Sequence, residues 1–185
     1  SLSGAGCHAM VSTPTRMGNG YPDGLVGTWT RHYCAIHGLP DSSSRLAGHV
    51  LGHCWWSNRG DSIDTRLVRK VRLAESDNST LTFWAWYDIE ENWDYAYVVA
   101  SNDNGETWST LEGSGTTEAN PLGLNYGHGY TGSSDGWVKE TVDLSRYAGQ
   151  DILIGFEYVT DEAVYLDGLV IDEIEISPNV FFDDV

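Results

Sequence analysis

Several features of common protein classes are missing from this 185-residue sequence. No apolar run approaches the roughly 20 residues that span a bilayer, and no segment has the pattern of a secretory signal peptide. The H-E-x-x-H pattern of zinc peptidases is absent, and no long stretch has helical periodicity. These absences argue against a membrane-spanning chain, a zinc peptidase domain and a helical fold.

Basic residues are scarce. Ten Lys and Arg face 27 Asp and Glu, which gives a net charge of −17. Such a surface repels phosphate backbones and anionic lipids, so nucleic acids and membranes are poor candidate partners. Hard cations, calcium above all, suit a protein rich in carboxylates. The alternative interpretation is a solvated acidic surface that confers only solubility.

Cysteines number only three, and all of them precede Trp55. An odd count argues against a disulfide framework, and the spacing of these cysteines and their neighbouring histidines fits no common zinc site. Residues 1–54 also contain only two acidic residues. We interpret 1–54 as an irregular or poorly ordered segment. A further hypothesis is that it is an out-of-frame translation joined to a genuine domain.

Side chains alternate in polarity throughout the remaining chain. The 21 glycines of the sequence and its Asn and Asp breaks suit tight turns between strands. We therefore predict an antiparallel β-sandwich over 55–177, with 178–185 as a linker or the start of a following module. The period-two segments are 65–73, 79–87, 94–101, 136–144, 151–159 and 169–176.

The segment SNDNGETW resembles the Asp-box hairpin, S-x-D-x-G-x-T-W. An aspartate at its third position can accept hydrogen bonds from backbone N–H groups, and its glycine can adopt a positive φ. We interpret it as a structural turn and not as evidence for glycan chemistry. Its motif residues are Ser101, Asp103, Gly105, Thr107 and Trp108.

Acidic residues in three places are candidate calcium ligands. Asp172 shares its predicted strand face with apolar residues, so its carboxylate needs a cation or an arginine partner. The other candidates are Asp61 and Asp64 in one segment and Glu90 and Asp94 in another. Carboxylates from separate loops suffice for calcium, although neither spacing matches an EF-hand. The alternatives are a salt bridge at Asp172 and solvated turns elsewhere.

Tryptophans are candidates for a second kind of site. Trp84, Trp86 and Trp137 could stack on sugar rings if they were exposed on a sheet. The alternative is that they form a second apolar layer, since central strands of a sandwich are often covered on both faces.

Three sequence blocks, in order, resemble the immune inhibitor A family of secreted zinc metallopeptidases. They are WWSNRGDSIDTRL, WYDIEENWDYAYV with the turn that follows it, and GYTGSSDGWVKETVDLSRYAGQ. The resemblance is to the family's non-catalytic region, a jelly-roll sandwich similar to MAM-type and galactose-binding-like domains. It covers about residues 55–176.

The resemblance implies a non-catalytic accessory domain with a structural calcium site. The family's zinc belongs to its catalytic domain, which has no counterpart in this chain. The implied partners are a catalytic peptidase domain of the same polypeptide and protein substrates, and the implied location is extracellular. The alternative function is a carbohydrate-binding module that uses the exposed tryptophans.

Overall fold

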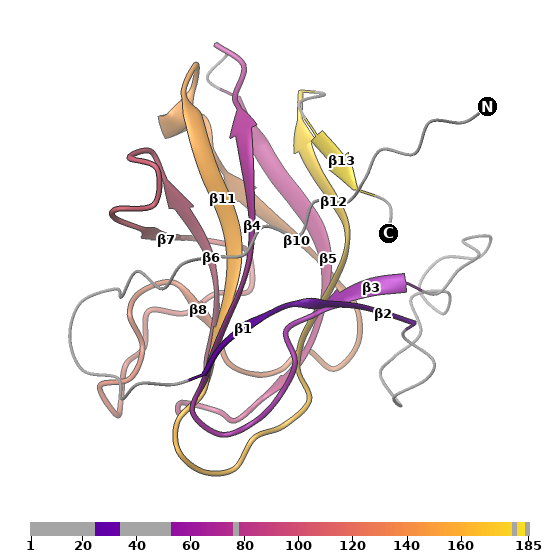
Figure 1. The fold of residues 1–185 in the computed structure, drawn as a ribbon, viewed down its shortest axis with the longest axis vertical. Helices are drawn as coiled ribbons and strands as arrows, with labels where there is room; N and C mark the ends of the chain where they lie inside the picture. Colours follow the sequence, from indigo (N-terminus) through magenta and orange to yellow (C-terminus); the bar gives the residue numbers. More distant parts are fainter. Residues whose placement is uncertain (1–24, 34–52, 76–77, 179–180, 184–185) are drawn as a thin grey trace.

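Two β-sheets packed face to face form the protein, which we describe from a computed structural model (Figure 1). The structure describes residues 25–33, 53–75, 78–178 and 181–183. Within these residues the only helical element is a single 3-10 turn, η3 (Ser145–Tyr147). The predicted antiparallel β-sandwich is confirmed, with one parallel pair at an edge.

The first sheet has the strand order β1-β4-β11-β6-β7, and β8 pairs with β6. Strand β1 runs parallel to β4, and the other neighbours are antiparallel. The strands are β1 (Leu25–Thr28), β4 (Ile63–Arg72), β6 (Tyr95–Ser101), β7 (Ser109–Leu111), β8 (Gly129–Tyr130) and β11 (Asp151–Val159).

The second sheet has the order β10-β5-β12-β3-β2, with β13 on β12 and β9 on β5. All its pairs are antiparallel. The strands are β2 (Thr30–Tyr33), β3 (His53–Trp56), β5 (Thr80–Ile89), β9 (Gly132–Ser133), β10 (Val138–Asp143), β12 (Gly168–Ser177) and β13 (Phe181–Asp183).

The core lies between the sheets and follows the alternation of the sequence. In β5 every second side chain is buried, including Leu81, Phe83 and Ala85. Phe83 meets Phe156 of β11 edge to face, with ring centroids 4.9 Å apart. Full burial of a side chain of this size contributes about 1.5–3 kcal/mol, so these contacts hold the two sheets together.

Strand β6 is buried on both faces. Ala96, Val98 and Ala100 face the main core. On the opposite face three side chains of β6 form a second cluster with three side chains from neighbouring segments. This cluster comprises Tyr95, Tyr97, Val99, Trp108, Leu124 and Tyr126. The loop that precedes β8 therefore covers the outside of this sheet, where the sequence pattern alone would expect a solvated face.

A β-bulge in β12 changes which residues face the core. The register with β5 shifts between Asp172 and Glu175, and Glu173 has a positive φ of 49°. Ile171 and Ile174 both lie in the main core. The expectation that Asp172 shares its strand face with apolar residues is therefore wrong for Ile174 and Ile176, because the extra residue reverses the alternation.

Strands also occur on the amino-terminal side of Trp55, where we expected irregular structure. Strand β1 pairs with β4, and β2 pairs with β3. Trp29 is 5% exposed within the main core, 5.9 Å from the ring of Phe156. Cys54 is disulfide-bonded, although the odd cysteine count argued against a disulfide framework. The rest of 1–54 lies outside the described residues, and the out-of-frame hypothesis stays a hypothesis.

Candidate metal centre

Three loops meet at the lower end of the sandwich in Figure 1. They are the β3–β4 loop (57–62), the β5–β6 loop (90–94) and the β11–β12 loop (160–167). In the β5–β6 loop the backbone N–H of Asp94 donates to the carbonyl of Glu90 at 3.0 Å. Asn92 has a φ of 68°, a conformation that asparagine tolerates well. This tight turn brings the side chains of Glu90 and Asp94 to one side.

Hydrogen bonds join the three loops. The backbone N–H of Asp161 donates to Oδ1 of Asp94 at 2.8 Å. The backbone N–H of Ser62 donates to the carbonyl of Asp161 at 2.5 Å, and the Thr160 hydroxyl donates to the carbonyl of Gly60 at 2.7 Å. The positions of the acidic side chains in these loops are therefore coupled.

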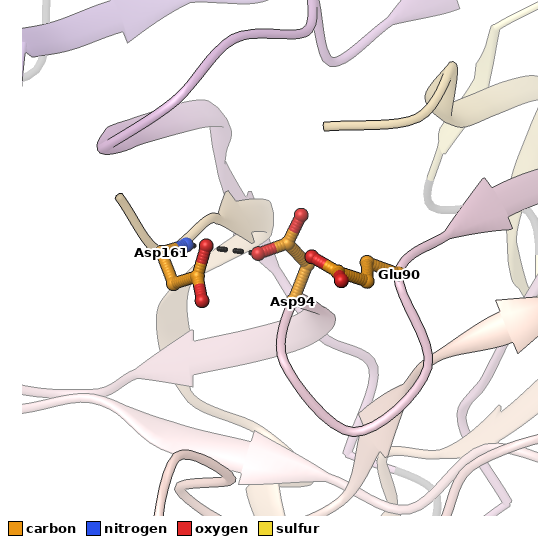
Figure 2. A group of neighbouring side chains, drawn as sticks. All are labelled: Glu90, Asp94 and Asp161. Carbon is orange, nitrogen blue, oxygen red and sulfur yellow. Dashed lines mark hydrogen bonds between the residues drawn. The ribbon is translucent and has the colours of Figure 1, made fainter. Parts of the chain in front are cut away.

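Glu90, Asp94 and Asp161 form the candidate site, which we call the acidic cluster (Figure 2). One carboxylate oxygen from each lies within 4.8 Å of the others. Asp94 is fully buried. Its Oδ2 and the Oε2 of Glu90 are both buried without a hydrogen-bond partner. Burying unpaired carboxylate oxygens is costly, and no partner for these two oxygens occurs among the residues that the structure describes.

The pKa shifts in the cluster follow from its burial and from the closeness of its carboxylates. Burial is the main cause that raises the pKa of Asp94 from 3.8 to about 7, and the charges of Asp161, Glu90 and Asp61 add to it. Burial, followed by the charge of Asp161, raises the pKa of Glu90. Among the described residues, no Lys or Arg forms an ion pair with the cluster. A bound cation would remove this repulsion.

The hydroxyl of Tyr158 belongs to the same environment. It is buried without a hydrogen-bond partner. Burial raises its pKa, and the charges of Asp94, Asp88, Glu90 and Asp167 raise it further. A neutral phenol oxygen beside several carboxylates adds a further polar atom near the cluster.

The donor set fits calcium better than zinc. The cluster offers carboxylate oxygens from three residues, without histidine or cysteine. Calcium takes six to eight oxygen ligands, typically carboxylates, loop carbonyls and water, whereas structural zinc sites use sulfur and nitrogen. Glu90, Asp94 and Asp161 would supply the carboxylates, and the surrounding loops can supply carbonyls.

The structure brings together only some of the five predicted calcium ligands. Glu90 and Asp94 belong to the cluster. Asp61 lies close enough for its charge to raise the pKa of Asp94. Asp64 and Asp172 lie elsewhere. Sequence reasoning missed Asp161, although its position directly after β11 and Thr160 was a usable signal, because strand ends often place side chains in a common loop layer.

Asp64 lies beside a buried ion pair on the outer face of the first sheet. The Arg66 guanidinium donates to the carboxylate of Glu157, and both side chains are buried. Arg66 also lies 5.1 Å from the ring centre of Trp108. Burial raises the pKa of Asp64, and the charge of Arg66 opposes that shift. Asp64 therefore shares one arginine with Glu157 and lies outside the acidic cluster.

Asp172 lies in the bulge of β12, buried to 4% exposure. Its Oδ1 accepts a hydrogen bond of 2.8 Å from the backbone N–H of Glu173. Neighbouring positions on the adjacent strand place it beside Trp84. Among the described residues, no group of metal-ligating side chains includes Asp172.

The SNDNGETW turn is held by its own side chains. The backbone N–H of Thr107 donates to both carboxylate oxygens of Asp103, at 2.9 and 3.0 Å. The Ser101 hydroxyl donates to Asp103 Oδ1 at 2.6 Å and accepts from the N–H of Gly105 at 2.8 Å. Bonds from Ser101 and Thr107 lower the pKa of Asp103. Trp108 packs in the second cluster, on the outer face of β6.

Two of the three predicted tryptophans pack in an apolar cluster. Trp86 and Trp137 are partly buried against Cys54, Val170 and Trp56, outside the second sheet. Trp84 is also partly buried. This packing resembles the second apolar layer that was the alternative to a glycan platform. The glycan platform itself stays a prediction.

The sequence comparison decides the family. The family described as immune inhibitor A-like, MAM domain, matches residues 47–185. The chain belongs to this family. The match begins on the amino-terminal side of Trp55, so it includes strand β3 as well as the predicted sandwich.

Curated relatives of this MAM-domain chain are much longer proteins. The pre-pro-metalloprotease PrtV of Vibrio cholerae is 35% identical over 122 residues, which is 66% of this chain and 13% of PrtV. Bacillopeptidase F of Bacillus subtilis is 27% identical over 84% of this chain and 10% of its own length. Immune inhibitor A of Bacillus thuringiensis is 26% identical over 79% of this chain and 21% of its own length.

A solved structure is also similar to this MAM-domain chain. It is the K3 cleaved adhesin domain of Lys-gingipain from Porphyromonas gingivalis, 19% identical, with a TM-score of 0.39 over 80% of this chain and 90% of that one.

Among the residues that the structure describes here, no helix has the length and hydrophobicity that crossing a bilayer requires.

Proposed function

We propose that this chain is a non-catalytic, calcium-stabilised accessory domain of a secreted metallopeptidase. Membership of the immune inhibitor A-like MAM family supports the association with proteolysis. One relative is named a metalloprotease, and the matched part covers only a small share of it. The sequence lacks H-E-x-x-H, so the peptide-bond chemistry is assigned to another part of a longer polypeptide.

The observation that carries the proposal is the acidic cluster. Three carboxylates converge from two loops, and two of their buried oxygens have no partner. Calcium bound there would tie the β5–β6 loop to the β11–β12 loop. Because the β3–β4 loop is hydrogen-bonded to Asp161, one ion would order three loops together.

The biological role that we propose is support of proteolysis. A calcium-ordered domain would stabilise the catalytic domain or contact protein substrates. Calcium sites of extracellular modules work at Kd values of about 10⁻⁴–10⁻³ M, which suits a secreted protein. In this setting calcium acts structurally and takes no part in peptide hydrolysis.

Calcium titration of the 185-residue chain tests the proposal. Thermal melting is measured in chelator and at rising calcium, with calorimetry for the stoichiometry. At 100 times Kd, one site stabilises the fold by about 2.7 kcal/mol. Asp94→Asn should abolish the gain, and Asp172→Asn, outside the cluster, should retain it. Equal melting temperatures with and without chelator would refute the calcium site.

A further inference from the structure

Asn104 and Gly105 lie in the middle of the SNDNGETW turn between β6 and β7, and Asn104 is exposed. Both have positive φ values, 61° and 90°, as in the tight hairpin turns that Asn-Gly favours. The sequence contains this dipeptide only here and at Asn19–Gly20, which lies outside the described residues. Asparagine is thermolabile, above all before glycine, because no side chain hinders the approach of the glycine nitrogen to the asparagine amide carbon.

The reaction open to this dipeptide is deamidation. The Gly105 nitrogen loses its proton and attacks Cγ of Asn104, so that a C–N bond forms and closes a five-membered succinimide ring. The side-chain nitrogen takes up a proton and leaves as ammonia. One water molecule then opens the ring to aspartate or isoaspartate. The net change is therefore uptake of one water and release of one ammonia, and the chain itself supplies every other atom.

Hydrogen bonds within the turn oppose this reaction. The Gly105 N–H donates to the Ser101 hydroxyl at 2.8 Å, and that hydroxyl donates to Oδ1 of Asp103 at 2.6 Å. Asp103 is held in turn by the backbone N–H of Thr107. Ring closure requires the Gly105 N–H to lose its proton and the peptide group after Asn104 to rotate toward Cγ. Both changes break the bond to Ser101, so the closed turn holds the reaction off.

We infer that Asn104 is a deamidation site and that Ser101 controls its rate. The reaction proceeds in molecules whose turn has opened locally, which is a smaller event than unfolding of the whole sandwich. The site is separate from the acidic cluster, because the turn follows β6 whereas Asp94 precedes it.

Deamidation would make the opening of the turn permanent. Isoaspartate carries the chain through its side-chain carbon and so lengthens the backbone by a methylene group. Asp103 then no longer faces the N–H of Thr107 in the present geometry. Trp108, which packs in the second cluster with its ring centre 5.1 Å from the Arg66 guanidinium, is placed by this turn. The modification would therefore loosen the outer face of the first sheet.

Peptide mapping of incubated protein tests the inference. The 185-residue chain is held in mildly alkaline buffer, folded or in urea, and conversion of Asn104 is followed by mass spectrometry. The rate in the folded chain should be at least about tenfold lower than in urea, since a turn held by several hydrogen bonds opens rarely. Ser101→Ala should raise the folded rate about fivefold, as expected for the loss of one such bond, and leave the rate in urea unchanged. The matched control is Ser109→Ala, an exposed serine just beyond the turn, which should change neither rate.

Two further variants separate local opening from global unfolding and check the chemistry. Ile176→Val removes a methyl group from the main core and lowers the stability of the fold about as much as the loss of one hydrogen bond. It should leave the folded rate at Asn104 unchanged. Gly105→Ala should slow the reaction in urea, because its methyl group hinders ring closure.

Three results would overturn the inference. The first is equal conversion of Asn104 in the folded chain and in urea, and the second is a folded rate that Ser101→Ala does not change. The third is a similar acceleration by Ile176→Val and Ser101→Ala, because global unfolding would then set the rate. An unchanged rate in urea for Gly105→Ala would exclude the succinimide route and with it the proposed site.

Discussion

Two buried carboxylates of this sandwich, Glu140 and Asp94, differ in how their oxygens are hydrogen-bonded. Glu140 is 3% exposed, and its Oε2 accepts hydrogen bonds from Ser114 Oγ, the N–H of Gly115 and Tyr130 Oη, at 2.9, 2.9 and 3.0 Å. Asp94 is also buried, yet its Oδ2 has no donor, and further carboxylates surround it. The protein supplies hydrogen-bond donors to the first carboxylate, whereas one oxygen of the second has none among the described residues. That difference distinguishes a structural carboxylate from a candidate ligand.

Replacement of the satisfied carboxylate should have the largest effect. Glu140→Leu removes three hydrogen bonds to a charged acceptor and leaves the Tyr130 hydroxyl buried without an acceptor, which should cost about 3–5 kcal/mol of unfolding free energy. Urea denaturation should show the same loss with calcium and with chelator. The exposed Glu112→Leu is the control and should change stability by less than about 0.5 kcal/mol. A calcium-dependent loss in Glu140→Leu would contradict the comparison.

Neutralising the unsatisfied carboxylate should have an effect that depends on calcium. In saturating calcium, Asp94→Asn should lose about 2.7 kcal/mol, the increment for a ligand at 100 times Kd. In chelator the same variant should be equal to the wild type or more stable, since it removes a buried charge beside Glu90 and Asp161. Urea denaturation under both conditions measures the change of sign. A similar loss in both conditions would mean that Asp94 acts only through its hydrogen bond.

The pH dependence of stability should separate the two forms of the acidic cluster. Burial raises the pKa of Asp94 from 3.8 to about 7 in the calcium-free protein. The folded state therefore binds the proton more tightly than the unfolded state between about pH 4 and 7. The contribution of Asp94 to stability is fully present below about pH 4 and is lost as the pH rises through 7, by at most about 1.4 kcal/mol per pH unit. Calcium binding requires the ionised carboxylate, so in calcium the stability should rise with pH instead of falling. Asp94→Asn should remove the fall in stability that is measured without calcium.

The smallest expected effect concerns the SNDNGETW turn, which is held by its own side chains. Gly105 has a φ of 90°, and an added Cβ would meet Leu153 at 3.4 Å, an ordinary contact. Gly105→Ala should therefore cost about 1 kcal/mol through backbone strain alone. Gly105→Asn should lose less, because asparagine tolerates positive φ better. Thermal melting of both variants checks the order, and equal losses would point to packing instead.

Local patterns made the strands predictable. The alternation in residues 79–87 corresponds to β5, with Leu81 and Phe83 in the core. The turn at 101–108 was also readable, because Ser101 and Asp103 bond to groups within a few residues. Both features depend on neighbours along the chain, so the sequence contains nearly all the information that they need.

The acidic cluster was only partly predictable. Glu90 and Asp94 share one turn, and sequence reasoning named both. Asp161 joins them from a loop more than 60 positions away, because β11 pairs with β6 and so carries its end to the same edge. Asp64 looked equally suitable, but its place beside the Arg66–Glu157 pair depends on strand register.

The sequence by itself determined that this protein is an acidic chain of alternating strands, because side-chain alternation and turn residues act over a few positions. Only the tertiary structure decided which carboxylates meet. Strand order placed Asp161 opposite Asp94, and one bulge separated Asp172 from the face that its alternation predicted. Coulomb energy and burial depend on distances in space, and those distances are set by register and sheet packing between segments remote in the chain.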